Sequence, residues 1–356
     1  MEKNEIDTPA LLVDLDALEW NISEMRDDLT TIGRHVRPHI KVHKSPAIAN
    51  MQARSGCIGV TCAKLGEAEV MASSGIRNIL IANQIVGPVK VDRLVGLARQ
   101  SDVMVAVDNA ENALEISKAA AARGSTVGVV IEVDVGFKRA GVQPGESVSS
   151  LAKKMARMEN LRLAGVMGYE GHLQGIASLE ERTRMVQKSV GQLVDSAKQL
   201  RRDGFECEIV STAGTNTYGI ASRIDGVTEV QAGSYTVMDN FHAVEGVKFR
   251  KALTVLTTVT STPEPGRAIV DAGLKAFADT TPFPLPKERI GIRVTELSEE
   301  HGHLDTSREK DLRLGERMEF YPFYAPTTVN LYEKVYGMRG DHVEVQWQIA
   351  ARGRSQ

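Results

Sequence analysis

The sequence Val36-Arg-Pro-His-Ile-Lys-Val-His-Lys44 is the first of eight segments that decide the fold. If it forms a β-strand, alternation of side chains places four polar residues on one face: Arg37, His39, Lys41 and His43. Four such groups are costly inside a barrel unless an anionic ligand compensates them. A lysine among cations also loses its proton more readily and becomes a nucleophile. The stretch therefore predicts either a solvated edge strand or an anion-binding site.

Seven further strand-like segments, most of them apolar, follow along the chain, and a helical pattern follows each of the first five. They are residues 58–62, 78–82, 103–107, 126–134, 163–169, 207–211 and 228–232. Unbroken apolar runs are typical of parallel strands that are buried on both faces. Eight β-then-α units of this kind predict a (β/α)8 TIM-type barrel rather than an open doubly wound sheet.

The helical patterns cease after the eighth unit and short strands separated by turns take their place. One of these strands is expected at residues 328–332. We expect residues 21–245 to form the barrel and residues 246–356 to form a C-terminal all-β domain. Residues 1–20 contain a strand left over from the barrel count, which we expect to join the β domain.

The composition indicates an ordinary globular protein. Of 356 residues, 42% are hydrophobic and 25% are charged, and the net charge is −3. The longest apolar run is well short of the ~20 residues needed to cross a bilayer. We also expect no secretory signal, and there is no block of basic residues. We therefore expect a cytoplasmic protein with a small-molecule ligand, no nucleic-acid partner and no membrane. Cys57, Cys62 and Cys207 are interpreted as buried free thiols.

Polar residues collect where the predicted strands end, which is where barrel enzymes place their sites. Ser211-Thr-Ala-Gly-Thr215 follows the seventh strand and Ala232-Gly-Ser-Tyr235 follows the eighth. Small, hydroxyl-rich loops that contain glycine bring several backbone N–H groups onto one phosphate. A phosphate here and a lysine on the first strand together predict pyridoxal 5′-phosphate as the cofactor.

Six short motifs occur in order along the chain. They are Thr8-Pro-Ala-Leu-Leu-Val-Asp-Leu-Asp16, Arg37-Pro-His-Ile-Lys-Val-His-Lys44, Tyr169-Glu-Gly-His172, Gly233-Ser-Tyr235, Asp271-Ala-Gly-Leu-Lys275 and Glu299-Glu-His-Gly302. Together they resemble the D-threonine aldolase and D-serine dehydratase family, a member of the alanine-racemase-like (fold type III) class of pyridoxal phosphate enzymes. The resemblance covers about residues 8–354.

The resemblance implies a role for several residues. Lys41, rather than Lys44, matches the family's Schiff-base position. Arg139 is implied to face the pyridine nitrogen, where a cation disfavours ring protonation and restrains side reactions. Tyr169 is implied to lie beside the ring. The phosphate is implied to be held by Thr212, Gly214, Thr215, Gly233, Ser234 and Tyr235.

The chain departs from the family where the family's divalent metal is bound, at a His-x-Cys or His-x-Asp pair within a Pro-x-His pattern. The matching segment, Tyr321-Pro-Phe-Tyr-Ala-Pro-Thr-Thr-Val-Asn330, places Tyr324 and Pro326 at the two ligand positions. Proline has no donor atom in its side chain, and a neutral phenol is a poor ligand for zinc, manganese or magnesium. The sequence therefore makes a divalent metal doubtful.

Two interpretations of this departure remain open. Metal is held by another route, for which His301, His303 and Asp305 are weak candidates, or Tyr324 does the work of the metal; we favour the second. Without metal, a base has to take the proton of a substrate hydroxyl. The sequence leaves four candidates for that base: His39, His43, Tyr324 and His301.

The resemblance implies a lyase that acts on a small β-hydroxy D-amino acid. The expected reaction is D-threonine aldolase-like, with reversible cleavage between Cα and Cβ to glycine and an aldehyde. D-serine dehydratase-like β-elimination and amino-acid racemisation are the alternatives within enzymes. A non-catalytic pyridoxal phosphate-binding protein is the alternative from another class, against which the long C-terminal β domain argues. We expect a homodimer with its active site at the subunit interface.

Overall fold

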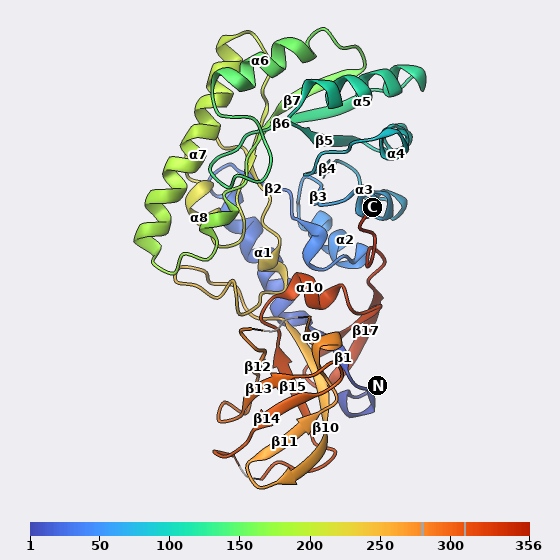
Figure 1. Cartoon of the computed structure of the whole chain (residues 1–356), viewed down its shortest axis with the longest axis vertical. Helices are drawn as coiled ribbons and strands as arrows, with labels where there is room; N and C mark the ends of the chain where they lie inside the picture. Colours follow the sequence, from blue (N-terminus) through green and yellow to red (C-terminus); the bar gives the residue numbers. More distant parts are fainter. Residues whose placement is uncertain (279–280, 310) are drawn as a thin grey trace.

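The computed structural model describes residues 1–278, 281–309 and 311–356. It has two parts that lie end to end, a parallel sheet surrounded by helices and a second sheet that contains most of the C-terminal third of the chain (Figure 1).

The first sheet consists of eight parallel strands. They are β2 (His35–Val36), β3 (Val60–Cys62), β4 (Ile79–Ile81), β5 (Val103–Val107), β6 (Val127–Glu132), β7 (Leu161–Met167), β8 (Ile209–Thr212) and β9 (Glu229–Val230). Their spatial order is β2-β9-β8-β7-β6-β5-β4-β3. A parallel bridge between His39 and Thr61 joins the two ends of this order, with the Thr61 amide donating to the Pro38 carbonyl over 2.9 Å. The predicted eight-stranded TIM-type barrel is therefore confirmed.

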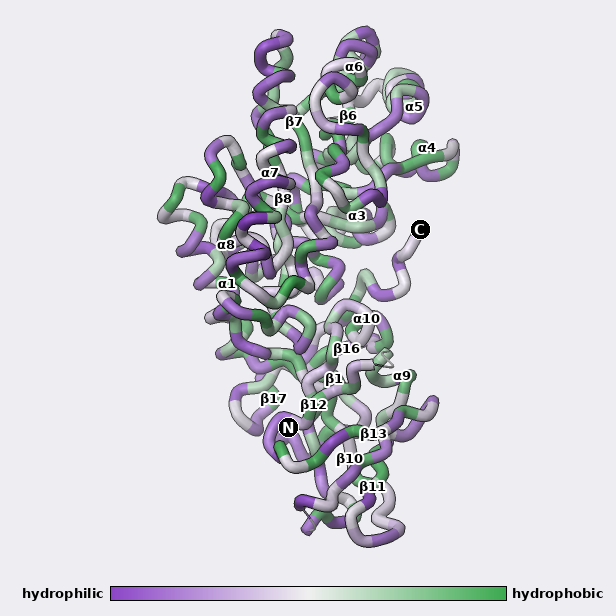
Figure 2. The backbone as a smooth tube through the Cα atoms, turned by 60° about the vertical axis from the view of Figure 1, so that its left-hand side comes forward, coloured by the Kyte–Doolittle hydropathy of each residue, from purple (hydrophilic) through white to green (hydrophobic). Residues whose placement is uncertain are grey.

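Helices follow the strands and cover the outside of the sheet. They are α1 (Leu15–Thr30), α2 (Pro46–Arg54), α3 (Leu65–Ser73), α4 (Pro88–Ala98), α5 (Ala110–Ala122), α6 (Glu146–Met155), α7 (Leu179–Arg202) and α8 (Tyr218–Ala221). Hydrophobic and hydrophilic residues alternate along α7, which buries Val186, Val190 and Leu193 against the barrel (Figure 2). Asp14 caps the N-terminus of α1, where its side chain accepts from the Ala17 amide over 2.9 Å.

The stretch that opens the barrel is not one strand, so the predicted alternation of its side chains is wrong. Only His35 and Val36 are in β2, and a 3-10 turn spans Ile40–Val42. Pro38 lacks an N–H, and its carbonyl accepts from Thr61 where the chain crosses the barrel rim. His39 and Lys41 consequently line the cavity, whereas His43 turns toward the β domain.

The second sheet contains β1 (Ala10–Asp14) from the N-terminal region, which lies between β10 and β16. Its other strands are β10 (Leu253–Glu264), β11 (Arg267–Val270), β12 (Leu285–Pro286), β13 (Arg293–Leu297), β14 (Gly302–Asp305), β15 (Arg317–Tyr321), β16 (Lys334–Arg339) and β17 (His342–Gln348). Two short helices, α9 (Leu274–Phe277) and α10 (Ala325–Val329), make this part mainly β rather than all β.

The strand predicted at residues 328–332 is also wrong. Residues 325–329 form α10, whose second residue is Pro326. Proline suits the first turn of a helix, where its missing N–H costs no hydrogen bond. Thr328 and Val329, which begin the predicted strand, are both buried in this helix.

Two further expectations concern single features of the chain. All three cysteines are free; Cys62 and Cys207 are buried, and Cys57 is partly buried. Among the described helices, none combines the length and the apolar character needed to span a membrane.

Candidate active site

A cavity of about 380 Å³ lies at the carboxyl ends of the barrel strands. Residues that follow β3, β4, β6, β7, β8 and β9 form most of its wall. His242, from the segment that leaves the barrel, and Tyr324, the residue before α10, complete it. The cavity continues outward between Phe137, Phe241 and Phe323. Barrel and β domain therefore share one site.

Lys41 and Arg139 lie over the same aromatic ring. The Lys41 Nζ atom is 5.7 Å from the centre of the Tyr169 ring, and the Arg139 guanidinium carbon is 5.6 Å from it. Burial, and next the positive charge of Arg139, lower the pKa of Lys41 to about 8, against the opposing effect of Glu67. A lysine with this pKa is partly neutral near physiological pH, which is what nucleophilic attack on an aldehyde requires.

Arg139 is flanked by an aromatic ring and a carboxylate. Its guanidinium carbon is 4.9 Å from the Phe137 ring centre, and its Nη2 is 3.7 Å from Glu132 Oε1. Burial raises the pKa of Glu132, while the Gln84 amide, which donates to Glu132 Oε2 over 2.5 Å, favours the charged form. Arg139 is half exposed, so it can turn toward a ligand in the cavity.

Two glycines in the loops after β8 and β9 allow a ligand to approach the backbone. A Cβ atom at Gly214 would lie 2.6 Å from the Gln174 side-chain oxygen, and one at Gly233 would lie 2.5 Å from the His39 carbonyl. Neither position has room for a side chain. The loops consequently present backbone and hydroxyl groups to the cavity, as a phosphate site does.

The hydroxyl groups of these loops are not equivalent. Thr215 Oγ1 accepts from the Tyr235 amide over 2.9 Å, so its own proton is left to donate to a ligand. Thr212 Oγ1 instead donates to the buried Glu170 carboxylate over 2.9 Å. Tyr235 takes part in this loop structure only through its amide, because its ring is buried and its hydroxyl accepts from Gln52. Ser234 lines the cavity.

His39 lines the cavity at the start of the barrel. Its Nδ1 atom is buried and has no hydrogen-bond partner among the described residues. Burial lowers the pKa of His39 well below its usual value, and the charge of Lys41 has the same effect. The imidazole is therefore neutral.

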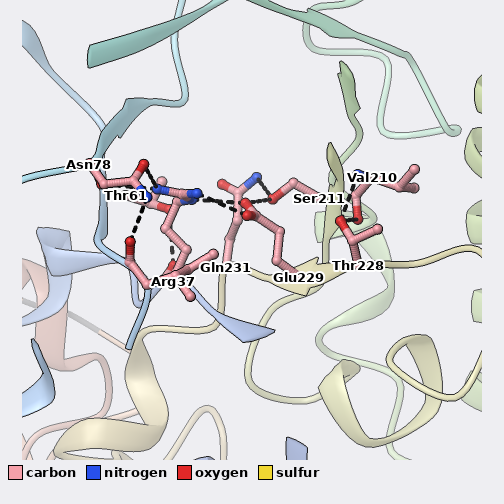
Figure 3. A network of polar contacts seen from close by, with 9 residues as sticks. Arg37, Thr61, Asn78, Val210, Ser211, Thr228, Glu229 and Gln231 are labelled. Atoms are coloured by element: carbon pink, nitrogen blue, oxygen red, sulfur yellow. Dashed lines mark hydrogen bonds and ion pairs between the residues drawn. The ribbon is translucent and has the colours of Figure 1, made fainter. Parts of the chain in front are cut away.

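A buried polar network lies inside the barrel beneath this cavity (Figure 3). Arg37 Nε and Nη2 each donate to a Glu229 carboxylate oxygen over 2.9 Å, and Nη1 donates to Asn78 Oδ1 over 2.7 Å. Ser211 donates to Glu229 over 2.8 Å, and Gln231 donates to Ser211 over 2.8 Å. Gln231 lines the cavity, so this network fixes the position of its floor.

Several predicted site residues lie elsewhere. His43 is buried beside Leu11, Val13 and Ile48, and burial lowers its pKa to about 4. Its Nδ1 accepts from the Ser45 amide over 3.2 Å. This environment keeps the ring neutral and separates it from the cavity.

The weak metal candidates are also remote from the cavity. His303 contacts Ser298 over 3.0 Å and Asp305 pairs with Arg293 over 2.5 Å, both around β14. His301, like these two, is absent from the described residues that line the cavity. Within residues 1–278, 281–309 and 311–356, no group of three or more His, Cys, Asp or Glu side chains is arranged to hold a metal ion.

The sequence interpretation missed several residues of the cavity wall. They are Lys64, Asn83, Gln84, Glu132, Gln174 and His242. All but Gln174 and His242 lie at or directly after a barrel strand, so the rule that located the other strand ends could have found them. Gln174 and His242 follow irregular segments and carried no such signal.

The fold is alanine-racemase-like, because a parallel barrel is closed by a β domain. At the ends of its strands the barrel carries a lysine with a lowered pKa and hydroxyl-bearing loops that contain glycine. Comparisons with known proteins agree. The model of the alanine racemase N-terminal domain matches residues 13–240, and that of a serine dehydratase domain matches residues 252–338. The chain belongs to this family, in the group of D-threonine and 3-hydroxy-D-aspartate aldolases.

Three relatives illustrate the group. A 3-hydroxy-D-aspartate aldolase of Paracoccus denitrificans (strain Pd 1222) is 34% identical over 99% of this chain and 94% of its own length. A D-threo-3-hydroxyaspartate dehydratase of Delftia sp. (strain HT23) is 30% identical over 96% of this chain and 97% of its own. The crystal structure of D-threonine aldolase from Filomicrobium marinum superposes with a TM-score of 0.96 at 36% identity, over 99% and 97% of the two chains. Membership of this family implies pyridoxal 5′-phosphate as the cofactor.

Proposed function

We propose that this protein is a pyridoxal phosphate-dependent lyase that cleaves a small β-hydroxy D-amino acid between Cα and Cβ, giving glycine and an aldehyde. The observation that carries the proposal is Lys41, a buried lysine with a lowered pKa, in a cavity that also contains glycine-rich, hydroxyl-bearing loops. Aldolases at 34–36% identity over nearly the whole chain support the reaction type.

The residues present fit the cofactor. Lys41 would hold its aldehyde carbon, and Thr215, Ser234 and the backbone around Gly214 and Gly233 would hold its phosphate. Arg139 and Tyr169 would flank the ring. When bound, pyridoxal phosphate supplies an electron sink for the pair of electrons released at Cα.

The protein's own groups perform the remaining work. Lys64 provides positive charge for the substrate carboxylate. The amine of Lys41 is positioned to return a proton to Cα after bond cleavage. A base in the cavity has to take the proton of the β-hydroxyl, because the β-carbon becomes a carbonyl only when that proton leaves.

Product analysis with D-threonine, D-serine and D-phenylserine tests the proposal. Aldehyde and glycine in equal amounts are expected. A 2-oxo acid and ammonia would instead indicate β-elimination, which the dehydratase relative makes the second candidate. Appearance of the L-enantiomer would indicate a racemase. Cofactor uptake without turnover of any of the three would favour a non-catalytic binding protein.

We further propose that catalysis needs no divalent metal. Tyr324 and Pro326 supply no metal ligand at the family's positions, and His301, His303 and Asp305 lie away from the cavity.

The proposed assembly is a homodimer whose subunit interface closes the active site. The cavity opens outward between the half-buried rings of Phe137, Phe241 and Phe323, an aromatic rim of the kind that interfaces favour. Light scattering coupled to size exclusion would test it: a mass of twice 38.8 kDa is expected, and a stable monomer with full activity would contradict it.

A further inference from the structure

His242 and Asp239 form a hydrogen-bonded pair on the cavity wall opposite the barrel strands. His242 Nδ1 is 2.7 Å from Asp239 Oδ1, and the His242 amide donates to the same oxygen over 2.9 Å. Asp239 Oδ2 accepts from the Ala325 amide over 2.9 Å. Asp239 is fully buried and His242 is 6% exposed. Both carboxylate oxygens are thus occupied, and the orientation of the imidazole is fixed.

This pair is next to the residue at the family's metal-ligand position. The His242 ring stacks on the Tyr324 ring, with centres 5.9 Å apart and planes 21° apart. Phe241 packs edge-on against both rings. The same backbone amide that anchors Asp239 belongs to the residue after Tyr324. The histidine is therefore built into the wall that the family uses for its metal.

The hydrogen bond to Asp239 also determines which nitrogen of His242 is available. A carboxylate accepts, so Nδ1 carries the proton, and Nε2 of the neutral ring is the basic nitrogen. His242 lines the cavity together with Lys41 and Arg139, in both its inner and its outer part. A base that is oriented by a buried carboxylate and that faces a cavity containing a nucleophile is a recurring catalytic arrangement.

We propose that His242, oriented by Asp239, is the catalytic base for the β-hydroxyl of the substrate, so that an imidazole does here what a metal site does in the family. The assignment rests on the proposed lyase function. His39 lines the cavity too, but has no carboxylate partner to orient it. His43 and His301 do not line it. Tyr324 lines it as well, and its ring stacks on the His242 ring.

The step balances without a further reactant. The β-hydroxyl proton moves to His242 Nε2 as the Cα–Cβ bond breaks. The oxygen forms a second bond to the β-carbon, which leaves as the aldehyde carbonyl, and the electron pair of the broken bond remains at Cα. Cα then takes a proton and becomes the CH₂ of glycine. His242 gives its proton to solvent before the next turnover.

The test compares His242→Gln with wild type in two reactions of the cofactor-loaded protein. Cleavage of D-threonine requires removal of the β-hydroxyl proton, whereas exchange of the Cα hydrogens of glycine with D₂O does not. We expect His242→Gln to lose cleavage by roughly 10²- to 10⁴-fold. We expect glycine exchange and cofactor uptake, followed by absorbance, to stay within threefold of wild type. Asp239→Asn should lose cleavage with the same selectivity but less severely.

His39→Gln is the matched control, because it removes the other imidazole of the cavity. The assignment is overturned if His242→Gln cleaves D-threonine within tenfold of wild type, or if it loses exchange and cofactor uptake as severely as cleavage. It is also overturned if His39→Gln shows the selective loss instead. A wild type that exchanges glycine but cleaves no β-hydroxy amino acid would refute the proposed function itself, a result distinct from these.

A second measurement needs neither cofactor nor activity. In the cofactor-free protein labelled with ¹⁵N-histidine, the resonances that disappear in His242→Gln should show a proton on Nδ1 and none on Nε2. The Nδ1 proton should lose its downfield shift in Asp239→Asn. A proton on Nε2 in the wild type would overturn the assignment.

Discussion

The two walls of the cavity differ in their secondary structure and in the residues that they present. The barrel wall presents Lys41, Arg139 and hydroxyl-bearing loops at the ends of regular strands. The opposite wall presents His242, from the segment that leaves the barrel, and Tyr324, the residue before α10, among aromatic rings. The first wall matches the family's motifs, and the second departs from them. We propose that the barrel wall serves the cofactor and that the opposite wall acts on the substrate.

Loss of the nucleophile is expected to have the largest effect. Lys41→Ala removes the amine that would hold the cofactor, so cleavage should fall by roughly 10³-fold or more. The absorbance band of the bound cofactor, and the covalent adduct trapped by borohydride and located by peptide mass spectrometry, should disappear. Lys64→Ala, in the same cavity, is the control that should retain the adduct. An adduct in Lys41→Ala, or a colourless wild type, would refute the barrel-wall assignment.

The next largest effect, a loss of stability, is expected when the buried polar network beneath the barrel wall is broken. Arg37→Met leaves the Glu229 carboxylate buried without its two charge-assisted hydrogen bonds. Removing one partner of a buried ion pair costs about 3–5 kcal/mol in the free energy of unfolding. Urea unfolding followed by circular dichroism measures it. Arg267→Met, on an exposed pair with Glu264, should change stability by less than about 1 kcal/mol; equal losses in both variants would contradict the account.

Thr215 and Thr212, the two threonines of the phosphate loops, are expected to contribute unequally to cofactor binding on the barrel wall. Thr215→Val removes a hydroxyl whose proton is available to the phosphate, and a hydrogen bond to a charged group contributes about 1.5–3 kcal/mol. Cofactor affinity, measured by titration of the apoprotein, should therefore weaken by roughly tenfold or more. Thr212→Val should weaken it less, since that hydroxyl donates to Glu170. The reverse order would show that the phosphate is held elsewhere.

The smallest expected effect is a shift in the pKa of Lys41 when the neighbouring charge of Arg139 is removed. Burial, and next the charge of Arg139, lower its pKa to about 8. The neutral amine is the reactive form, so the rate of Lys41 acetylation in the apoprotein should rise with pH and reach half its maximum near pH 8. Arg139→Gln removes a positive charge and should move this midpoint to higher pH. Peptide mass spectrometry after brief labelling measures it, and a midpoint that fell in Arg139→Gln would contradict the electrostatic interpretation.

The same contrast explains what could be predicted from the sequence. The barrel was predictable because most of the buried parallel strands are continuous apolar runs, and Arg139 and Thr215 follow such runs. The 3-10 turn at Ile40–Val42 was not predictable, because it depends on the Thr61 amide bonding to Pro38 from a strand distant in sequence. His43 was therefore placed on the wrong face.

The opposite wall was beyond prediction for a similar reason. Asp239 and His242 lie in a segment without regular structure, and their contacts with Ala325 and Tyr324, more than 80 residues away in the sequence, hold His242 at the cavity. Tyr324 itself was identified from the family's register, whereas its stacking partner had no signal in the sequence. The helix at Ala325–Val329 was similarly hidden by apolar residues that resemble a strand.

Removal of divalent metal tests the central contrast between the walls most directly. The cofactor-loaded wild type would be dialysed against a chelator, its metal content measured, and its production of glycine and acetaldehyde from D-threonine compared before and after. If His242 does the work of the family's metal, the rate should stay within twofold, and added Mn²⁺ or Zn²⁺ should not raise it. Loss of cleavage on chelation, restored by one of these ions, would contradict the account.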